Sequence, residues 1–409
     1  MILSEQRFKQ INVIENGCID DVQGFYTTGT HCGLKRKKPD LGLIYCENVA
    51  EAAGVFTTNQ IQAAPLRLTK SLIETTGTLQ AVVVNSGNAN ACTGKQGMID
   101  AKEMQKCVAE KFNLNETDVA VSSTGVIGEQ LPMDKVRAGI NTLSVAESKG
   151  SFAEAILTTD TTTKEICVEI LIDEQPVRIA GVAKGSGMIH PNMATMLSFL
   201  ATDATMKGSE LQQLLRDTTN ETFNRITVDG DSSTNDMVLA LASNKVQHKQ
   251  LNQNHPQWGV FQEAFQLCAT ELAKMIARDG EGATKLIEVQ VVGAKSNDDA
   301  GKIAKTIVGS DLVKTAVFGK DGNWGRIICA IGYSGCTISP DLIDIAIGPY
   351  ATLKESEPCG TNDKEITAYM TEEETIVISV NLHVGTGVGK AWGCDLSYDY
   401  VRINAGYRT

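Results

Sequence analysis

The sequence lacks any run of the roughly 18 or more apolar residues that a helix needs to cross a membrane. Its first residues, from Met1 to Gln6, also lack the apolar stretch of a signal peptide. None of the eleven cysteines forms a CxxC pair, so zinc ribbons and thioredoxin-like redox sites have no support. These absences predict a cytoplasmic protein whose cysteines are reduced and serve as small core residues.

Positive charge is also scarce, because 37 Lys and Arg face 49 Asp and Glu, which gives a net charge of −12. Binding to phosphate groups needs a basic surface, so we expect neither a nucleic-acid partner nor docking on anionic lipid. The five His show no spacing typical of a metal site. The 409 residues suffice for two or three folding units, and a hydrophobic share of 42% is ordinary for a globular protein.

Short apolar strands alternate with amphipathic helices along the chain, which is typical of a mixed α and β fold. We expect layers of sheet covered by helices. The polar run Asn85 to Asn90 is interpreted as a turn, and a boundary between folding units is predicted near Lys285 to Asp298. The predicted strands are 81–84, 119–121, 166–172, 177–182 and 195–200, and the predicted helices are 98–112, 211–223 and 258–276.

The most unusual segment runs from Lys184 to Leu197. Gly185, Gly187 and Pro191 make a non-helical approach to a predicted strand. A Thr at the start of that strand, Thr195, would have its hydroxyl held by rigid backbone. Taken alone, the segment is explained more simply by a glycine-rich loop that enters a strand with an incidental Thr.

Further segments stand in a fixed order around this one, and together they span essentially the whole chain. They are Gly24-Phe25, Gly33–Lys35, Asp40–Ile44, Val55–Asn59, Asn85–Ala91, Ser123–Gly128, Thr158–Thr161, Asp229–Asp236, Arg278–Thr284, Trp324–Arg326 and Arg402–Thr409. With these motifs the chain resembles the ornithine acetyltransferase family, the bifunctional glutamate N-acetyltransferases of arginine biosynthesis. The agreement of so many motifs in order makes coincidence implausible.

The resemblance implies a precursor that cleaves itself between Ala194 and Thr195. The products would be an α chain, residues 1–194, and a β chain, residues 195–409, with a smaller α/β domain from about residue 290. The implied fold is a mixed α and β sandwich of αββα type, as in enzymes with an N-terminal nucleophile. Thr195 would then carry both a hydroxyl nucleophile and a free α-amine, whose ordinary pKa near ~8 suits a general base.

Acyl transfer also needs donors for the developing oxyanion, and the resemblance assigns this role to Thr124 and Gly125. A hydroxyl and a glycine N–H can converge where a carbonyl oxygen becomes charged. From the residues alone, a turn after a strand, capped by Thr124, is the more ordinary interpretation.

The same resemblance implies substrate contacts at six positions. They are Thr158, Lys184, Thr195, Glu281, Asn404 and Thr409. Lys184 could pair with a substrate carboxylate and Glu281 with an ammonium group, although unassigned charges are more often solvated. Thr159 and Thr161 stand close enough to Thr158 to compete for its role.

The implied reaction transfers the acetyl group of N-acetylornithine to glutamate through an acetyl ester of Thr195, in ping-pong order. It releases ornithine and N-acetylglutamate, and some family members also accept acetyl-CoA. The resemblance implies no metal or organic cofactor and a heterotetramer of two α and two β chains. A self-processing amidohydrolase or aminopeptidase and a non-catalytic binding protein remain as alternatives.

Overall fold

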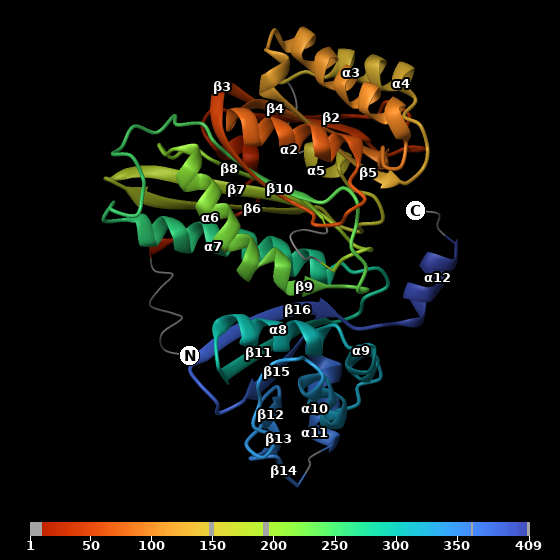
Figure 1. Cartoon of the computed structure of the whole chain (residues 1–409), viewed down its shortest axis with the longest axis vertical. Helices are drawn as coiled ribbons and strands as arrows, with labels where there is room; N and C mark the ends of the chain where they lie inside the picture. Colours follow the sequence, from red (N-terminus) through yellow and green to blue (C-terminus); the bar gives the residue numbers. More distant parts are fainter. Residues whose placement is uncertain (1–9, 147–150, 191–195, 361–362, 407–409) are drawn as a thin grey trace.

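The computed structural model describes residues 10–146, 151–190, 196–360 and 363–406. They form two sheets, one above the other in Figure 1, with helices covering both. The larger sheet has the strand order β1-β6-β7-β8-β10-β3-β4-β5, and β2 also pairs with β3. Its strands are β1 Asn12–Ile14, β2 Phe25–Thr30, β3 Leu41–Phe56, β4 Thr78–Asn88, β5 Val119–Val126, β6 Lys164–Ile172, β7 Gln175–Lys184, β8 Leu197–Thr202 and β10 Met237–Ala242.

The larger sheet curls so that its two ends pack on each other. In β4, Val84 faces a core that also holds Val182 of β7 and Phe199 of β8. The next residue, Val83, faces the other way, against Met104 of a covering helix. Because neighbouring strand residues point to opposite faces, this alternation places two sheet layers between two helix layers. The mixed α and β class, with sheets covered by helices, is confirmed.

Two groups of helices form the outer layers. α2, α3 and α4 lie over the β4–β5 end, and α6 and α7 lie over the β6–β10 part, as Figure 1 shows. The helix α7 carries an apolar stripe that the sequence predicts, with Phe261, Phe265 and Leu272 fully buried. The bounds are α2 Ala64–Thr76, α3 Gly94–Phe112, α4 Met133–Thr142, α5 Ser151–Ala155, α6 Gly208–Glu221 and α7 Trp258–Arg278.

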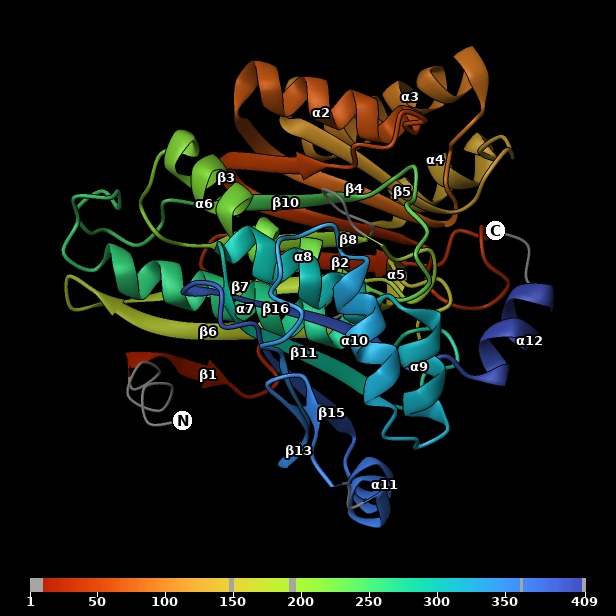
Figure 2. The same cartoon turned by 60° about the horizontal axis from the view of Figure 1, so that its bottom comes forward.

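The smaller sheet has the order β14-β13-β12-β15-β11-β16-β9 and an apolar core. Its helix α8 packs on β11 and β16, and α12 projects from the body beside it in both views (Figures 1 and 2). The strands are β9 Ile226–Thr227, β11 Leu286–Ala294, β12 Asp344–Ile347, β13 Tyr350–Lys354, β14 Glu357–Pro358, β15 Thr375–Asn381 and β16 Gly387–Cys394. The helices are α8 Asn297–Val308, α9 Asp311–Phe318, α10 Trp324–Gly332, α11 Asp363–Glu372 and α12 Tyr398–Gly406.

The predicted turn at Asn85 to Asn90 is wrong over its first four residues, because β4 continues to Asn88. The polar side chains there are buried and bonded within the protein. Ser123 donates its hydroxyl proton to Asn85 Oδ1 over 2.6 Å, and Asn85 Nδ2 donates to the carbonyl of Asn88 over 2.8 Å. Likewise, β5 runs on through Thr124 to Val126, so the interpretation of Thr124 as a turn residue is also wrong.

Across the described parts of the chain, every helix is too short or too polar to span a lipid bilayer.

Candidate active site

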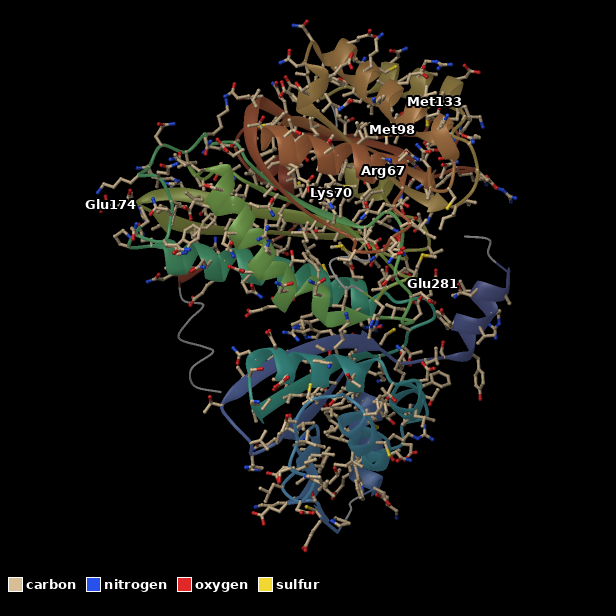
Figure 3. The ribbon with its side chains drawn as sticks, in the orientation of Figure 1. Arg67, Lys70, Met98, Met133, Glu174 and Glu281 are labelled. Atoms are coloured by element: carbon tan, nitrogen blue, oxygen red, sulfur yellow. The ribbon has the colours of Figure 1, made fainter. Side chains whose placement is uncertain are left out.

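A cavity of about 220 Å³ lies where β5, β7 and the start of β8 meet the residues before β10 and the helix α12. Glu281, which is labelled in Figure 3, is one of the residues that line it. All six predicted site residues that the structure describes line it, namely Thr124, Gly125, Thr158, Lys184, Glu281 and Asn404. Ala194, Thr195 and Thr409 lie outside the described residues. Met196, which follows Thr195 in the chain, is also part of the cavity wall.

The Thr124-Gly125 pair lies near the end of β5, at a point where β4 and β5 approach closely. Gly125 has φ +132°, and a Cβ there would lie 2.3 Å from the backbone carbon of Gly87 in β4. Only glycine fits both the conformation and the space. The parallel pairing of β4 and β5 therefore fixes the position of the Thr124 hydroxyl at the cavity.

Lys184, the last residue of β7, extends its ammonium to two hydroxyl groups of the cavity. Its Nζ donates to Thr158 Oγ1 over 2.9 Å and to Thr124 Oγ1 over 3.3 Å. Burial lowers the pKa of Lys184, while the nearby carboxylate of Asp160, 4.0 Å from Nζ, opposes that shift. One buried cation thus holds two predicted site threonines in place.

A buried ion network lies behind these residues and was missed by the sequence analysis. Lys164 is inaccessible to solvent, and its Nζ lies 2.7 Å from Asp160 and 2.6 Å from Asp279. Asp160 also accepts the N–H of Gly185 over 2.7 Å and that of Thr158 over 3.0 Å. Burial alone would raise the pKa of Asp160, but Lys184 and Lys164 hold it below its usual value. Asp160 is therefore an anion that fixes the backbone on both sides of the cavity.

Glu281 and Asn404 form another part of the cavity wall. Asn404 Nδ2, on α12, donates to Glu281 Oε2 over 2.8 Å. A Cβ at Gly187 would lie 2.5 Å from the carboxyl of Glu281, so the second glycine of the Lys184–Leu197 segment makes room for that carboxylate. The side chain of Glu281 is only 7% exposed, which leaves a buried carboxylate available to a cationic ligand group.

His190, in the same segment, is engaged elsewhere. Its Nδ1 lies 2.9 Å from Thr227 Oγ1, and burial lowers its pKa to about 4, so the ring is neutral near pH 7. Asp229 accepts the N–H groups of Met188 and Ile189 and holds this part of the loop. These contacts indicate that His190 and Asp229 stabilise the loop beside the cavity.

Within the described residues, no three His, Cys, Asp or Glu side chains converge in a way that could hold a metal ion. The polar groups of the cavity are instead hydroxyls, amides, one lysine and carboxylates. Such a set suits recognition of an amino acid, which carries both an ammonium and a carboxylate.

The sequence is similar to those of known proteins. The model of the ArgJ family matches residues 26–409. The arginine biosynthesis bifunctional protein ArgJ of Shouchella clausii is 65% identical over 405 residues, which cover 99% of this chain and 98% of that protein. Its namesake in Halalkalibacterium halodurans is 58% identical, with 97% of each chain covered. A crystal structure of ArgJ from Bacillus halodurans has 63% identity and a TM-score of 0.52, and covers 52% of this chain and 100% of that chain.

Proposed function

The chain belongs to the ArgJ family, and on that premise we propose that it transfers the acetyl group of N-acetylornithine to glutamate. It is an acyltransferase of arginine biosynthesis. The observation that carries the proposal is the convergence of Thr124, Lys184 and Glu281 on one cavity, whose wall includes the residue after Thr195. The transfer takes two steps, with the acetyl group held between them as an ester of Thr195.

The nucleophile is produced by self-cleavage between Ala194 and Thr195. The cut leaves chains of 194 and 409 − 194 = 215 residues, and the new α-amine of Thr195 accepts the proton of its own hydroxyl. The length of the solved Bacillus halodurans chain supports a division of this kind. All of that chain matches, and the match covers 52% of this sequence. The proposed β chain, with 215 of 409 residues, is about 53% of the sequence.

The residues that line the cavity have different roles in this proposal. Thr124 and Gly125 stabilise the oxyanion of the tetrahedral intermediate. Lys184 positions the hydroxyls of Thr124 and Thr158 and attracts the substrate carboxylate. Glu281 and Asn404 bind the side-chain ammonium of ornithine, and Thr409 completes the substrate site.

Intact-mass measurement tests the nucleophile directly. The purified protein should show two chains, and the 215-residue chain should gain one acetyl group when N-acetylornithine is added without glutamate. Addition of glutamate should then remove that group and yield N-acetylglutamate. A single full-length chain, or a β chain that never gains mass, would contradict the proposal.

A hydrolase with the same nucleophile is the second candidate, because an acetyl ester of Thr195 could also pass to water. The two are separated by the product, since a hydrolase yields free acetate where the transferase yields N-acetylglutamate. The use of acetyl-CoA as a second donor is tested in the same assay. A tag fused after Thr409 should raise KM if that residue contacts the substrate, and an unchanged KM would remove it from the site.

We further propose that the protein acts in the cytoplasm and that its two chains assemble as a heterotetramer of two α and two β chains. Light scattering coupled to gel filtration gives the mass of the assembly. A particle with one copy of each chain would disprove the tetramer and leave the chemistry unchanged.

A further inference from the structure

Asp236 stands out among the carboxyl groups that line the cavity. Its side chain is only 3% exposed, and within the described residues its Oδ2 atom has no hydrogen-bond partner. A buried polar atom without a partner is energetically unfavourable. At the wall of a binding site, such a cost is offset when the missing partner arrives with the substrate.

Other charged groups of the cavity already have hydrogen-bond partners within the described residues. Lys184 donates to two threonine hydroxyls, Asn404 Nδ2 donates to Glu281 Oε2, and Asp229 accepts two backbone N–H groups. Asp231 is exposed to solvent. Asp236 differs from these groups because one oxygen of its buried carboxyl group has no hydrogen-bond partner within the described residues.

The position of Asp236 relates it to the nucleophile. Asp236 directly precedes β10, and Met196 directly precedes β8, the parallel neighbour of β10. The N–H of Met237 donates to the carbonyl of Met196 over 3.0 Å, which fixes these two strand ends beside each other. Asp236 therefore lies beside Met196, the residue that follows Thr195 in the chain, and both line the cavity.

The environment of Asp236 favours the neutral acid. Burial raises the pKa of its carboxyl well above the ordinary value, while hydrogen bonding from Ser233 and the charge of Lys184 oppose that rise. A carboxylic acid can donate a proton, which a carboxylate cannot. An amine departing from an amide needs a proton, since an amide anion is too basic to leave.

We propose that Asp236 is a further catalytic residue, the acid that protonates the departing amine nitrogen during acylation. This rests on the proposed function. In acylation, Thr195 Oγ bonds the acetyl carbon, the C–N bond breaks, and the hydroxyl proton passes to the Thr195 α-amine. The Asp236 proton passes to the leaving nitrogen. The acyl-enzyme then holds an ammonium and a carboxylate of opposite charge, and deacylation by the incoming amine returns both protons.

Two acetyl donors separate this role from a structural one. N-acetylornithine must lose an amine that needs a proton, whereas p-nitrophenyl acetate loses a phenolate that is stable as an anion. Asp236→Asn should slow acetylation of the β chain by N-acetylornithine about 100-fold, the scale of general acid catalysis, and leave the ester reaction nearly unchanged. Asp236→Glu should restore part of the amide reaction.

Ser198→Ala is the matched control, because Ser198 also carries a buried oxygen without a partner among the described residues but does not line the cavity. It should change neither reaction. Equal slowing of both donors by Asp236→Asn would overturn the proposal. An unaltered enzyme that takes up acetyl from neither donor would instead refute the acyltransferase function itself.

If Asp236→Asn no longer cleaves itself, the proposal is tested on the unaltered enzyme by solvent isotope effects. Acetylation from N-acetylornithine should then be slowed more in D₂O than acetylation from p-nitrophenyl acetate, since one more proton moves. Equal solvent isotope effects for the two donors would also overturn the proposal.

Discussion

The two sheets of this protein bury different kinds of side chain. At one end of the larger sheet, Asp160, Lys164, Lys184 and Asp236 are all buried, and they surround or support one cavity. The core of the smaller sheet is built from apolar residues such as Ile303, Ile345 and Ile378, and the lysine buried beside it, Lys314, donates to the carbonyl of Cys394. Buried ionisable groups are costly and cluster at functional sites, so the group of them around the cavity indicates that the larger sheet carries the reactive region.

Of the substitutions that test this difference between the two sheets, Thr195→Ala is expected to have the largest effect on transfer. Without the hydroxyl, the chain should remain uncut and transfer should fall by at least ~10⁴-fold, as for loss of a nucleophile in other enzymes. Intact mass and the rate of N-acetylglutamate formation measure the two effects. Thr195→Ser, which keeps a hydroxyl, should still be cleaved. Transfer by uncut Thr195→Ala protein would show that the region around the cavity does not owe its reactivity to Thr195.

Asp160→Asn tests whether the buried charge network stabilises the fold. Removal of one partner of a buried ion pair costs about 3–5 kcal/mol, measured as the free energy of unfolding in urea at pH 7. The pKa of Asp160 is lowered in the folded protein, so its stabilisation is present above the unfolded pKa and is lost as the pH falls. The deficit of Asp160→Asn should therefore shrink below about pH 4. A deficit independent of pH would point to lost hydrogen bonds instead.

Thr124→Ala should slow transfer by ~10²–10³-fold, the usual loss when one oxyanion donor is removed. The effect should fall on kcat rather than on KM, because the donor acts on the transition state. Thr124→Ser keeps the hydroxyl and serves as the control. A normal kcat for Thr124→Ala would remove this residue from the oxyanion role and leave Gly125 as its candidate.

The smallest effect is expected in the smaller sheet. Ile378 of β15 is 1% exposed, and Ile378→Val removes one methylene from the apolar core. The free energy of unfolding should fall by about 1 kcal/mol, while kcat and KM for transfer stay at their original values. A clear change in kcat would show that the smaller sheet takes part in catalysis.

Periodicity alone predicted the elements that have one buried face. The apolar stripe of α7 and the alternation of β6 each follow from a local pattern, so those elements could be located from the sequence. The extension of β4 through Asn85 and Ser86 could not, because polar residues in a strand depend on partners elsewhere in the chain. Ser86, for example, donates to the carbonyl of Ala155.

The residues of the candidate site also fall into those that the sequence predicts and those that only the structure reveals. Thr124, Lys184 and Glu281 were predicted because segments of the chain resemble a known family. Asp160 lay inside one of those segments, but its role depends on Lys164 and, through it, on Asp279, 119 positions further along (279 − 160 = 119). Asp236 also lay inside such a segment. Its importance rests on an oxygen without a described partner, which no spacing of residues reveals.

The strand order β7-β8-β10-β3 has a consequence for the proposed cut. β8 and β10 come from the residues after Thr195, yet they stand between β7 and β3, which come from the residues before it. The two products would be interleaved in one hydrogen-bonded sheet. Their separation would require the ladders β7–β8 and β10–β3 to open together, so the halves should part only when the whole domain unfolds.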